Sequence, residues 1–157
     1  MTSDRIGILF VCHGNICRSP MAEYIMKHIV SFKGISDLFD IASCATSCEE
    51  IGNDVYPPAR AVLEENGISC GHRAARRFTA DDYHHYDNII VMDRRNLSAI
   101  MRMTDGDPDG KVTMMMSELG RDADVADPWY TGSFDITYDV LTEACTALLG
   151  RLLPTSV

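Results

Sequence analysis

The sequence predicts an α/β protein with three layers, in which helices flank both faces of a parallel sheet of about four strands. Short apolar runs of strand length alternate with segments of helical period along the chain. The first of these runs leads through a tight loop directly into a helix. The chain has 157 residues, and a chain of this size buries roughly two-thirds of its unfolded surface around one core. We therefore expect residues 1–157 to form a single domain.

The first pair of elements is a strand followed by a helix. Arg5–Val11 is a largely apolar run, which is typical of a strand buried on both faces of a parallel sheet. After a short loop, apolar side chains recur at helical spacing from Met21 to Phe32. Pro20 suits the first turn of that helix, and Gly34 ends it.

The later elements continue the alternation of strands and helices. Three short apolar runs predict strands: Phe39–Ser43, Asn88–Met92 and Lys111–Met116. Four segments of helical period predict helices: Pro58–Asn66, Thr79–Tyr86, Asp93–Met103 and Phe134–Leu153. The acidic segment 105–110 is interpreted as a surface turn, because the ligand spacing of a calcium loop is missing.

Composition and charge limit the partners and the compartment. The formal net charge is -9, which argues against a nucleic-acid or anionic-membrane surface because those partners favour a basic face. No stretch approaches the roughly 18 apolar residues of a membrane span, and the first residues lack a small-residue cleavage site. Six cysteines in a chain that can form its own core are expected to be reduced thiols. We expect a cytoplasmic protein.

The segment between the first strand and the first helix, CHGNICRS, predicts a phosphate-binding loop. A loop at the carboxyl end of a parallel strand that turns into a helix points backbone N–H groups into one concavity, where the helix dipole adds positive potential. The same field favours Cys12 as a thiolate nucleophile. Arg18 can grip two phosphoryl oxygens, and Ser19 can donate its hydroxyl to the sulfur. The other loop residues are His13, Gly14, Asn15, Ile16 and Cys17.

A carboxylic acid near this loop would protonate a departing phenolate, with a rate gain of about 10² to 10⁴. Asp127 stands out among the acidic residues because Pro128 fixes the chain direction after it. Trp129 and Tyr130 follow as potential aromatic walls of the site. An Asp-Pro turn with two packing aromatics is the alternative that these residues leave open.

The loop and its surroundings resemble a known family. VCHGNICRSPMAE is similar to the phosphate-loop signature of low-molecular-weight protein tyrosine phosphatases. The resemblance extends to IASCATS with Ser43, the EEIGN that follows, His72 after GIS, Met92-Asp93 and Asp127-Pro128-Trp129-Tyr130. It implies a four-stranded parallel sheet, no metal and no other cofactor. It also implies hydrolysis of phosphotyrosine and small aryl phosphate monoesters through a phosphocysteine, with Cys12, Arg18 and Asp127 as nucleophile, phosphate ligand and general acid.

The resemblance also implies partners and supporting residues. Phosphotyrosine-containing proteins would be the substrates, and inorganic phosphate would be product and inhibitor. Asn15, Ser43 and His72 would hydrogen-bond one another and hold the loop in its strained form. Cys17 would be a redox partner that forms a disulfide with an oxidised Cys12, although packing beneath the loop is an alternative.

Two departures from the family bear on the substrate. Many relatives have an aromatic residue on the wall opposite the Asp-Pro loop, where this chain has Cys48-Glu49-Glu50. A wall made by Glu49 and Glu50 predicts a mild preference for basic residues around the phosphotyrosine. Relatives that act on phosphoarginine tend to have Thr where this loop has Ile16, so Ile16 favours the tyrosine-type substrate.

Two other functions compete with the phosphatase. A thiol-coupled arsenate reductase shares this fold and loop but needs two downstream resolving cysteines, whereas only Cys70 lies near that region. A zinc-binding module would use Cys44, Cys48, Cys70 and His72, whose spacing matches none of the common zinc frameworks.

Overall fold

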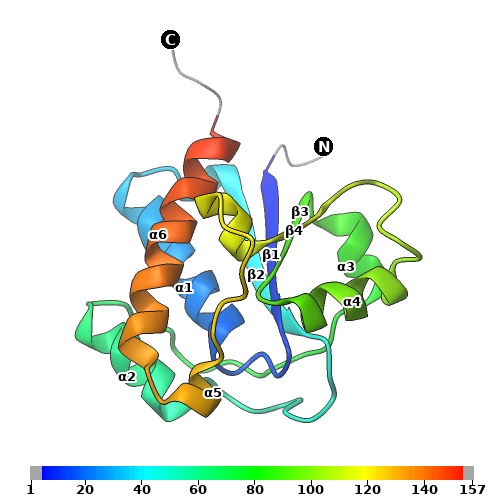
Figure 1. Cartoon of the computed structure of the whole chain (residues 1–157). Coiled ribbons are helices and arrows are strands. Elements are labelled where there is room, and N and C mark those ends of the chain that lie inside the picture. The colour runs from blue at the N-terminus through cyan, green and yellow to red at the C-terminus, as the bar shows by residue number, and fades with distance from the viewer. Residues whose placement is uncertain (1–4, 154–157) are drawn as a thin grey trace.

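Four parallel strands form one sheet in the computed structural model, which describes residues 5–153. Their order is β2-β1-β3-β4, and both β2 and β3 pair with β1 in parallel (Figure 1). The bounds are Ile6–Cys12 for β1, Phe39–Ala45 for β2, Asn88–Val91 for β3 and Val112–Met114 for β4. This sheet confirms the predicted fold class. The ends of the predicted domain, residues 1–4 and 154–157, lie outside the described residues.

Helices cover both faces of the sheet (Figure 1). The face that packs against α1, α2 and α6 lies opposite the face that packs against α3 and α4. None of the helices in residues 5–153 is long and apolar enough to cross a membrane. The helical bounds are Arg18–Phe32 (α1), Pro57–Glu65 (α2), Ala80–His85 (α3), Arg94–Met103 (α4), Pro128–Thr131 (α5) and Phe134–Leu152 (α6), with 3-10 turns at Ser36–Leu38 (η1) and Met115–Leu119 (η2).

The central strand β1 explains why its sequence is apolar without alternation. Ile8 and Phe10 belong to the core under α1 and α6, whereas Leu9 and Val11 belong to the core under α3 and α4. All four side chains are fully buried. Successive side chains of a strand point to opposite faces, so a strand covered on both faces needs apolar residues at every position.

The predicted elements agree with the structure except at the edge strand. The run Lys111–Met116 was expected to be one strand, but β4 is only Val112–Met114 and η2 begins at Met115. Met115 and Met116 are buried in the core under α6, so the apolar run continues without continuing the strand. The short helix α5 was not predicted, because four residues are too few to show a helical period.

The topology brings distant segments to one edge of the sheet. In a parallel sheet all carboxyl ends lie on the same side, and ligands bind there. Cys12 ends β1 and pairs in register with Ala45, which ends β2. Asp93 comes two residues after β3. This edge therefore collects the phosphate loop, the segment after β2 and the beginning of α4.

Candidate active site

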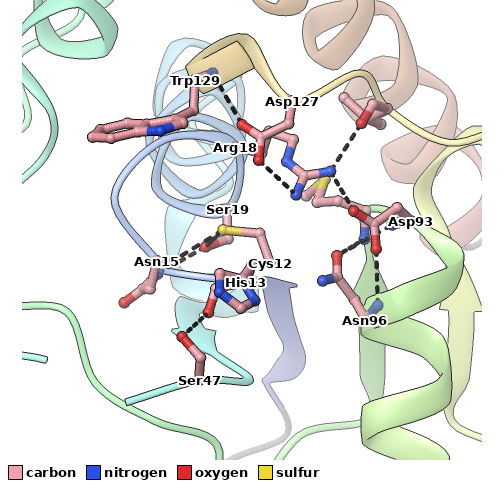
Figure 2. Close-up of polar contacts among 12 residues, drawn as sticks. Cys12, His13, Asn15, Arg18, Ser19, Ser47, Asp93, Asn96, Asp127 and Trp129 are labelled. Atoms are coloured by element: carbon pink, nitrogen blue, oxygen red, sulfur yellow. Dashed lines mark hydrogen bonds and ion pairs between the residues drawn. The ribbon is translucent and has the colours of Figure 1, made fainter. Parts of the chain in front are cut away.

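The loop from Cys12 to Ser19 lies between β1 and α1, as the sequence predicted (Figure 2). Cys12 is buried, and its Sγ is 3.0 Å from the Ser19 Oγ. The backbone N–H of Asn15 donates to the same sulfur at 3.3 Å. Both contacts place hydrogen-bonding groups around the sulfur, which stabilises a thiolate and leaves it oriented as a nucleophile.

The buried side chain of Asn15 ties the loop to neighbouring segments through hydrogen bonds. Its backbone has φ 59, in the left-handed region that non-glycine residues rarely adopt. Its side-chain Nδ2 donates to Ser19 Oγ at 2.8 Å and to Ser43 Oγ at 2.9 Å. Ser43 Oγ donates in turn to the buried carboxylate of Glu23 at 2.6 Å. This chain of hydrogen bonds connects the loop to β2 and α1.

Arg73, and not His72, completes the support of Asn15. Arg73 Nη1 donates to the Asn15 backbone carbonyl at 2.7 Å, and Nη2 donates to Asn15 Oδ1 and to Ser43 Oγ. The predicted bonding of His72 to Asn15 and Ser43 is wrong. The His72 side chain is 97% exposed, with Nδ1 3.1 Å from Asp54 Oδ2. Gly71 has φ 55, and after this turn the longer side chain of Arg73 is the one that reaches the loop.

Arg18 lies at the first position of α1 and is almost fully buried. Its Nη1 donates to Asp93 Oδ2 at 2.8 Å and to the carbonyl of Val125 at 2.9 Å, and its Nη2 is 3.5 Å from Asp127 Oδ2. Burial alone would lower the pKa of this guanidinium, but the negative charges of Cys12, Asp127 and Asp93 raise it overall. Arg18 is therefore held charged and oriented at the mouth of the loop (Figure 2).

Asp127 caps the short helix α5 and faces Arg18. Its Oδ1 accepts the backbone N–H of Trp129 at 3.0 Å, while Oδ2 is the oxygen near Arg18. The side chain keeps 28% of its surface exposed. Figure 2 shows the carboxylate above Cys12, so that a phosphoryl group bound between the two would have its leaving oxygen on the side of Asp127.

These residues enclose a narrow pocket of about 140 Å³ with Cys12 at its base. Trp129 contributes a half-exposed aromatic wall that packs on Tyr56, with ring centroids 4.7 Å apart. On the other wall, Glu49 Oε2 is 2.6 Å from His13 Nε2. The remaining lining residues are Gly14, Ile16, Cys17, Arg18, Glu50, Asp127 and Tyr130. Asn15 and Ser19 of the loop and Ser43 of β2 are buried and do not line the pocket.

The cysteines do not gather into a metal site. Cys44 is fully buried in β2, whereas Cys48 is exposed in the loop that follows. Among residues 5–153, no group of three His, Cys, Asp or Glu side chains is arranged to hold a metal ion. The four residues of the zinc hypothesis therefore do not form one ligand set.

Cys17, in the phosphate loop, is also buried, and this burial together with the nearby Cys12 raises the pKa of its thiol.

Sequence reasoning missed four residues that shape the site. Asp93 and Glu23 lie in the segments that carry the resemblance, Met92-Asp93 and VCHGNICRSPMAE, but no role was assigned to either. A role for Asp93 could have been inferred, since an acidic residue just after a parallel strand lies at the ligand-binding edge. Tyr56, before the proline that starts α2, had no signal of its own. Arg73 was overlooked because its neighbour His72 was the residue that corresponded to the family pattern.

Comparison with known proteins gives consistent matches. A family model described as low molecular weight phosphotyrosine protein phosphatase matches residues 7–156. Low molecular weight protein-tyrosine-phosphatase YfkJ of Bacillus subtilis is 32% identical over 149 residues, which cover 94% of this chain and 96% of that protein. Low molecular weight phosphotyrosine protein phosphatase of Schizosaccharomyces pombe is 41% identical over 135 residues, which cover 83% and 85%.

Solved structures agree with the sequence matches. The crystal structure of YfkJ has a TM-score of 0.90 at 33% identity and covers 94% of each chain. The crystal structure of SP-PTP, a low molecular weight protein tyrosine phosphatase from Streptococcus pyogenes, has a TM-score of 0.86 at 36% identity. It covers 96% of this chain and 95% of that one.

Proposed function

We propose that this chain, which belongs to the low molecular weight phosphotyrosine protein phosphatase family, hydrolyses phosphotyrosine and small aryl phosphates through a phosphocysteine on Cys12. One observation supports the assignment of these catalytic roles to particular residues. Cys12, Arg18 and Asp127 line the same pocket, although Asp127 lies more than 100 residues after the loop that contains the other two.

In the first step, the Cys12 thiolate attacks the phosphorus atom of a monoester bound in the loop. The S–P bond forms while the P–O bond to the tyrosine breaks, and Asp127 in its acid form gives its proton to the departing phenolate oxygen. Arg18 stabilises the charge that spreads over the phosphoryl oxygens. Ser19 Oγ, 3.0 Å from the sulfur, supports the thiolate before the attack and as the leaving group afterwards.

In the second step, water attacks the phosphocysteine. The Asp127 carboxylate accepts a proton from this water as the P–S bond breaks, which regenerates the thiolate and the acid. The products are the dephosphorylated tyrosine and inorganic phosphate, and phosphate occupies the same loop as a competitive inhibitor. Every step uses groups that the chain itself supplies.

The shape of the pocket supports a phosphotyrosine protein as substrate. A planar ring fits between Trp129, Tyr130 and the Ile16 side of the loop, and a tyrosine is long enough to bring its phosphorus to Cys12. The wall near Glu49 is acidic, and Glu49 Oε2 lies 2.6 Å from His13 Nε2. We place this activity in the cytoplasm, where the six thiols that the structure leaves unpaired would stay reduced.

The direct test is to isolate the intermediate. Purified protein is mixed with phosphotyrosine peptide labelled at phosphorus, quenched within one turnover and analysed for phosphocysteine on Cys12. We expect label on the wild type and none on Cys12→Ser. Turnover with label on another residue, or turnover by Cys12→Ser, would contradict the assignment. Arsenate-dependent oxidation of thioredoxin would favour the reductase, which the family match does not favour.

A further inference from the structure

A second concave surface adjoins the catalytic pocket, and the proposed mechanism does not use it. This groove has a volume of about 710 Å³ and lies between α4 and the segment after β2. Arginines dominate its lining, and no acidic residue of the described chain lines it. Its charged and polar lining includes His13, Ser47, Arg77, Arg94, Arg95 and Arg102. We refer to it as the arginine groove.

Two of these arginines have no partner in the part of the chain that the structure describes. Arg95 and Arg102 are exposed and make no hydrogen bond or ion pair with any of residues 5–153. They are seven positions apart on α4, with Ser98 and Ala99 between them, so they project from the same face of the helix. Two unpaired cations on one helix face, with only small residues between them, leave room for an extended anionic chain.

The other two arginines, Arg77 and Arg94, each have one partner for their side chain among the described residues. Arg77 Nε donates to the carbonyl of Thr46 at 3.2 Å, which fixes its guanidinium at the floor of the groove. Arg94 forms an ion pair with the exposed Asp122. The lining is therefore positive on balance, although the whole chain has a net charge of -9. A local field of opposite sign to the net charge points to a specific anionic ligand.

The groove is continuous with the catalytic pocket. His13 lines both concavities, and Asp93, which accepts a hydrogen bond from Arg18, is the N-cap residue of α4 (Figure 2). His13 forms one part of the rim of the pocket, so a polypeptide that extends over this part of the rim from a phosphotyrosine in the pocket would reach the groove. The part of the substrate nearest the groove is therefore the chain just beside the phosphotyrosine.

We propose that the arginine groove docks an acidic segment of the substrate protein beside its phosphotyrosine. This inference rests on the proposed phosphatase function and adds a sequence preference to it. The groove is an open concavity with room for an extended chain, and the acidic remainder of the protein disfavours a membrane or nucleic acid. Acidic residues would then be favoured on one side of the phosphotyrosine, while the Glu49 wall favours basic residues on the other.

The test uses three phosphotyrosine peptides of equal length. One has three Glu before the phosphotyrosine, one has three Glu after it, and the reference has Gln at all six places. We expect one of the acidic peptides to exceed the reference in kcat/KM by about three- to tenfold at low salt. The ratio should approach one at about 1 M salt, where the Debye length is about 3 Å.

A pair of charge-matched variants locates the effect. In Arg95→Gln/Arg102→Gln the ratio of the acidic peptide to the reference should fall to about one. In Lys33→Gln/Arg121→Gln, which removes two exposed charges that do not line the groove, the ratio should stay as in the wild type. Both variants change the net charge equally, so the comparison separates a local contact from the overall field.

The outcomes separate this inference from the proposed function. Wild type that hydrolyses para-nitrophenyl phosphate but does not distinguish the three peptides overturns the docking groove and leaves the phosphatase standing. Loss of the preference in both variants alike also overturns it. Arginine-dependent binding to phosphatidylserine vesicles without any peptide preference would assign the groove to a membrane instead. Failure to hydrolyse para-nitrophenyl phosphate is a failure of the proposed function.

Discussion

Arg73 holds Asn15 at two points, its backbone carbonyl and its side-chain oxygen, and so fixes the left-handed turn of the phosphate loop. We expect Arg73→Ala to lower kcat/KM for aryl phosphates by about 10- to 100-fold, since hydrogen bonds from a charged donor are worth about 1.5 to 3 kcal/mol each. The inhibition constant for phosphate should rise in parallel, because the loop would lose its preformed shape. Steady-state kinetics with phosphate as inhibitor measure both.

Arg73→Lys and His72→Ala are the matched controls for this prediction. Lys supplies charge without the planar fork, so it should restore part of the activity. His72 is exposed and contacts only Asp54 among the described residues, so its removal should have a much smaller effect than that of Arg73. An equal loss in His72→Ala and Arg73→Ala would contradict the geometry.

Asp127→Ala should lower kcat by about 10² to 10⁴ with phosphotyrosine, because the phenolate would depart without a proton. The loss should shrink for aryl phosphates with more acidic leaving groups, which need no proton. Losses of the same size across a leaving-group series would remove Asp127 from the acid role.

Phosphotyrosine peptides should be hydrolysed far better than phosphoserine peptides of the same sequence. The nucleophile lies at the base of a pocket with aromatic walls, and a serine side chain is too short to place phosphorus against Cys12. Trp129→Ala should narrow this difference in kcat/KM by raising KM for phosphotyrosine, since packing of the substrate's tyrosine ring on that wall is lost. Comparable kcat/KM for the two wild-type substrates would show that the pocket does not select by length.

Cys17 should protect Cys12 during oxidation. Peroxide would convert the Cys12 thiolate to a sulfenic acid, and the Cys17 thiol would then displace water to form a disulfide that dithiothreitol reduces. Burial and Cys12 raise the pKa of Cys17, so this thiol stays protonated and less reactive towards peroxide itself. Cys17→Ser should therefore lose activity irreversibly where the wild type recovers. Full recovery of the variant, with no disulfide in the oxidised wild type by mass spectrometry, would leave Cys17 as a packing residue.

Stability should fall in acid through Asp82. Its carboxylate accepts bonds from Arg76 at 2.9 Å and from the backbone of Thr79 at 2.8 Å, and these outweigh burial and lower its pKa below the ordinary 3.8. A carboxyl with a lowered pKa stabilises the fold above pH 3.8, and the contribution disappears as pH drops through the folded value. Asp82→Asn should cost about 1 to 2 kcal/mol at pH 7.

The difference between Asp82→Asn and wild type should disappear in urea titrations at pH values well below that ordinary pKa. Asp81→Asn is the control, because it removes the same charge from an exposed position in the same turn of α3. A cost that does not change with pH would mean that Asp82 acts through shape rather than charge.

The sequence by itself determined the fold class and the positions of Cys12 and Arg18 in the phosphate loop. A buried strand, a loop and a helix follow one another within about 30 residues in a βαβ unit, so their order decides where Cys12 and Arg18 lie. Both residues belong to one local segment, whose backbone geometry fixes their spacing. The largely apolar sequence of β1 likewise predicted that both of its faces are buried.

Only the tertiary structure decided which distant residues reach that loop. Asp93, Asp127 and Arg73 come from three separate segments, and their side chains meet the loop because parallel strands end at one edge of the sheet. Arg73 and His72 are neighbours in the sequence, but the turn that contains them directs Arg73 to Asn15 and leaves His72 in solvent. The arginine groove has the same origin, since the cations of α4 and Arg77 become neighbours only when α4 packs beside the segment after β2. Sequence spacing carries no information on such contacts, because they depend on the packing of whole elements.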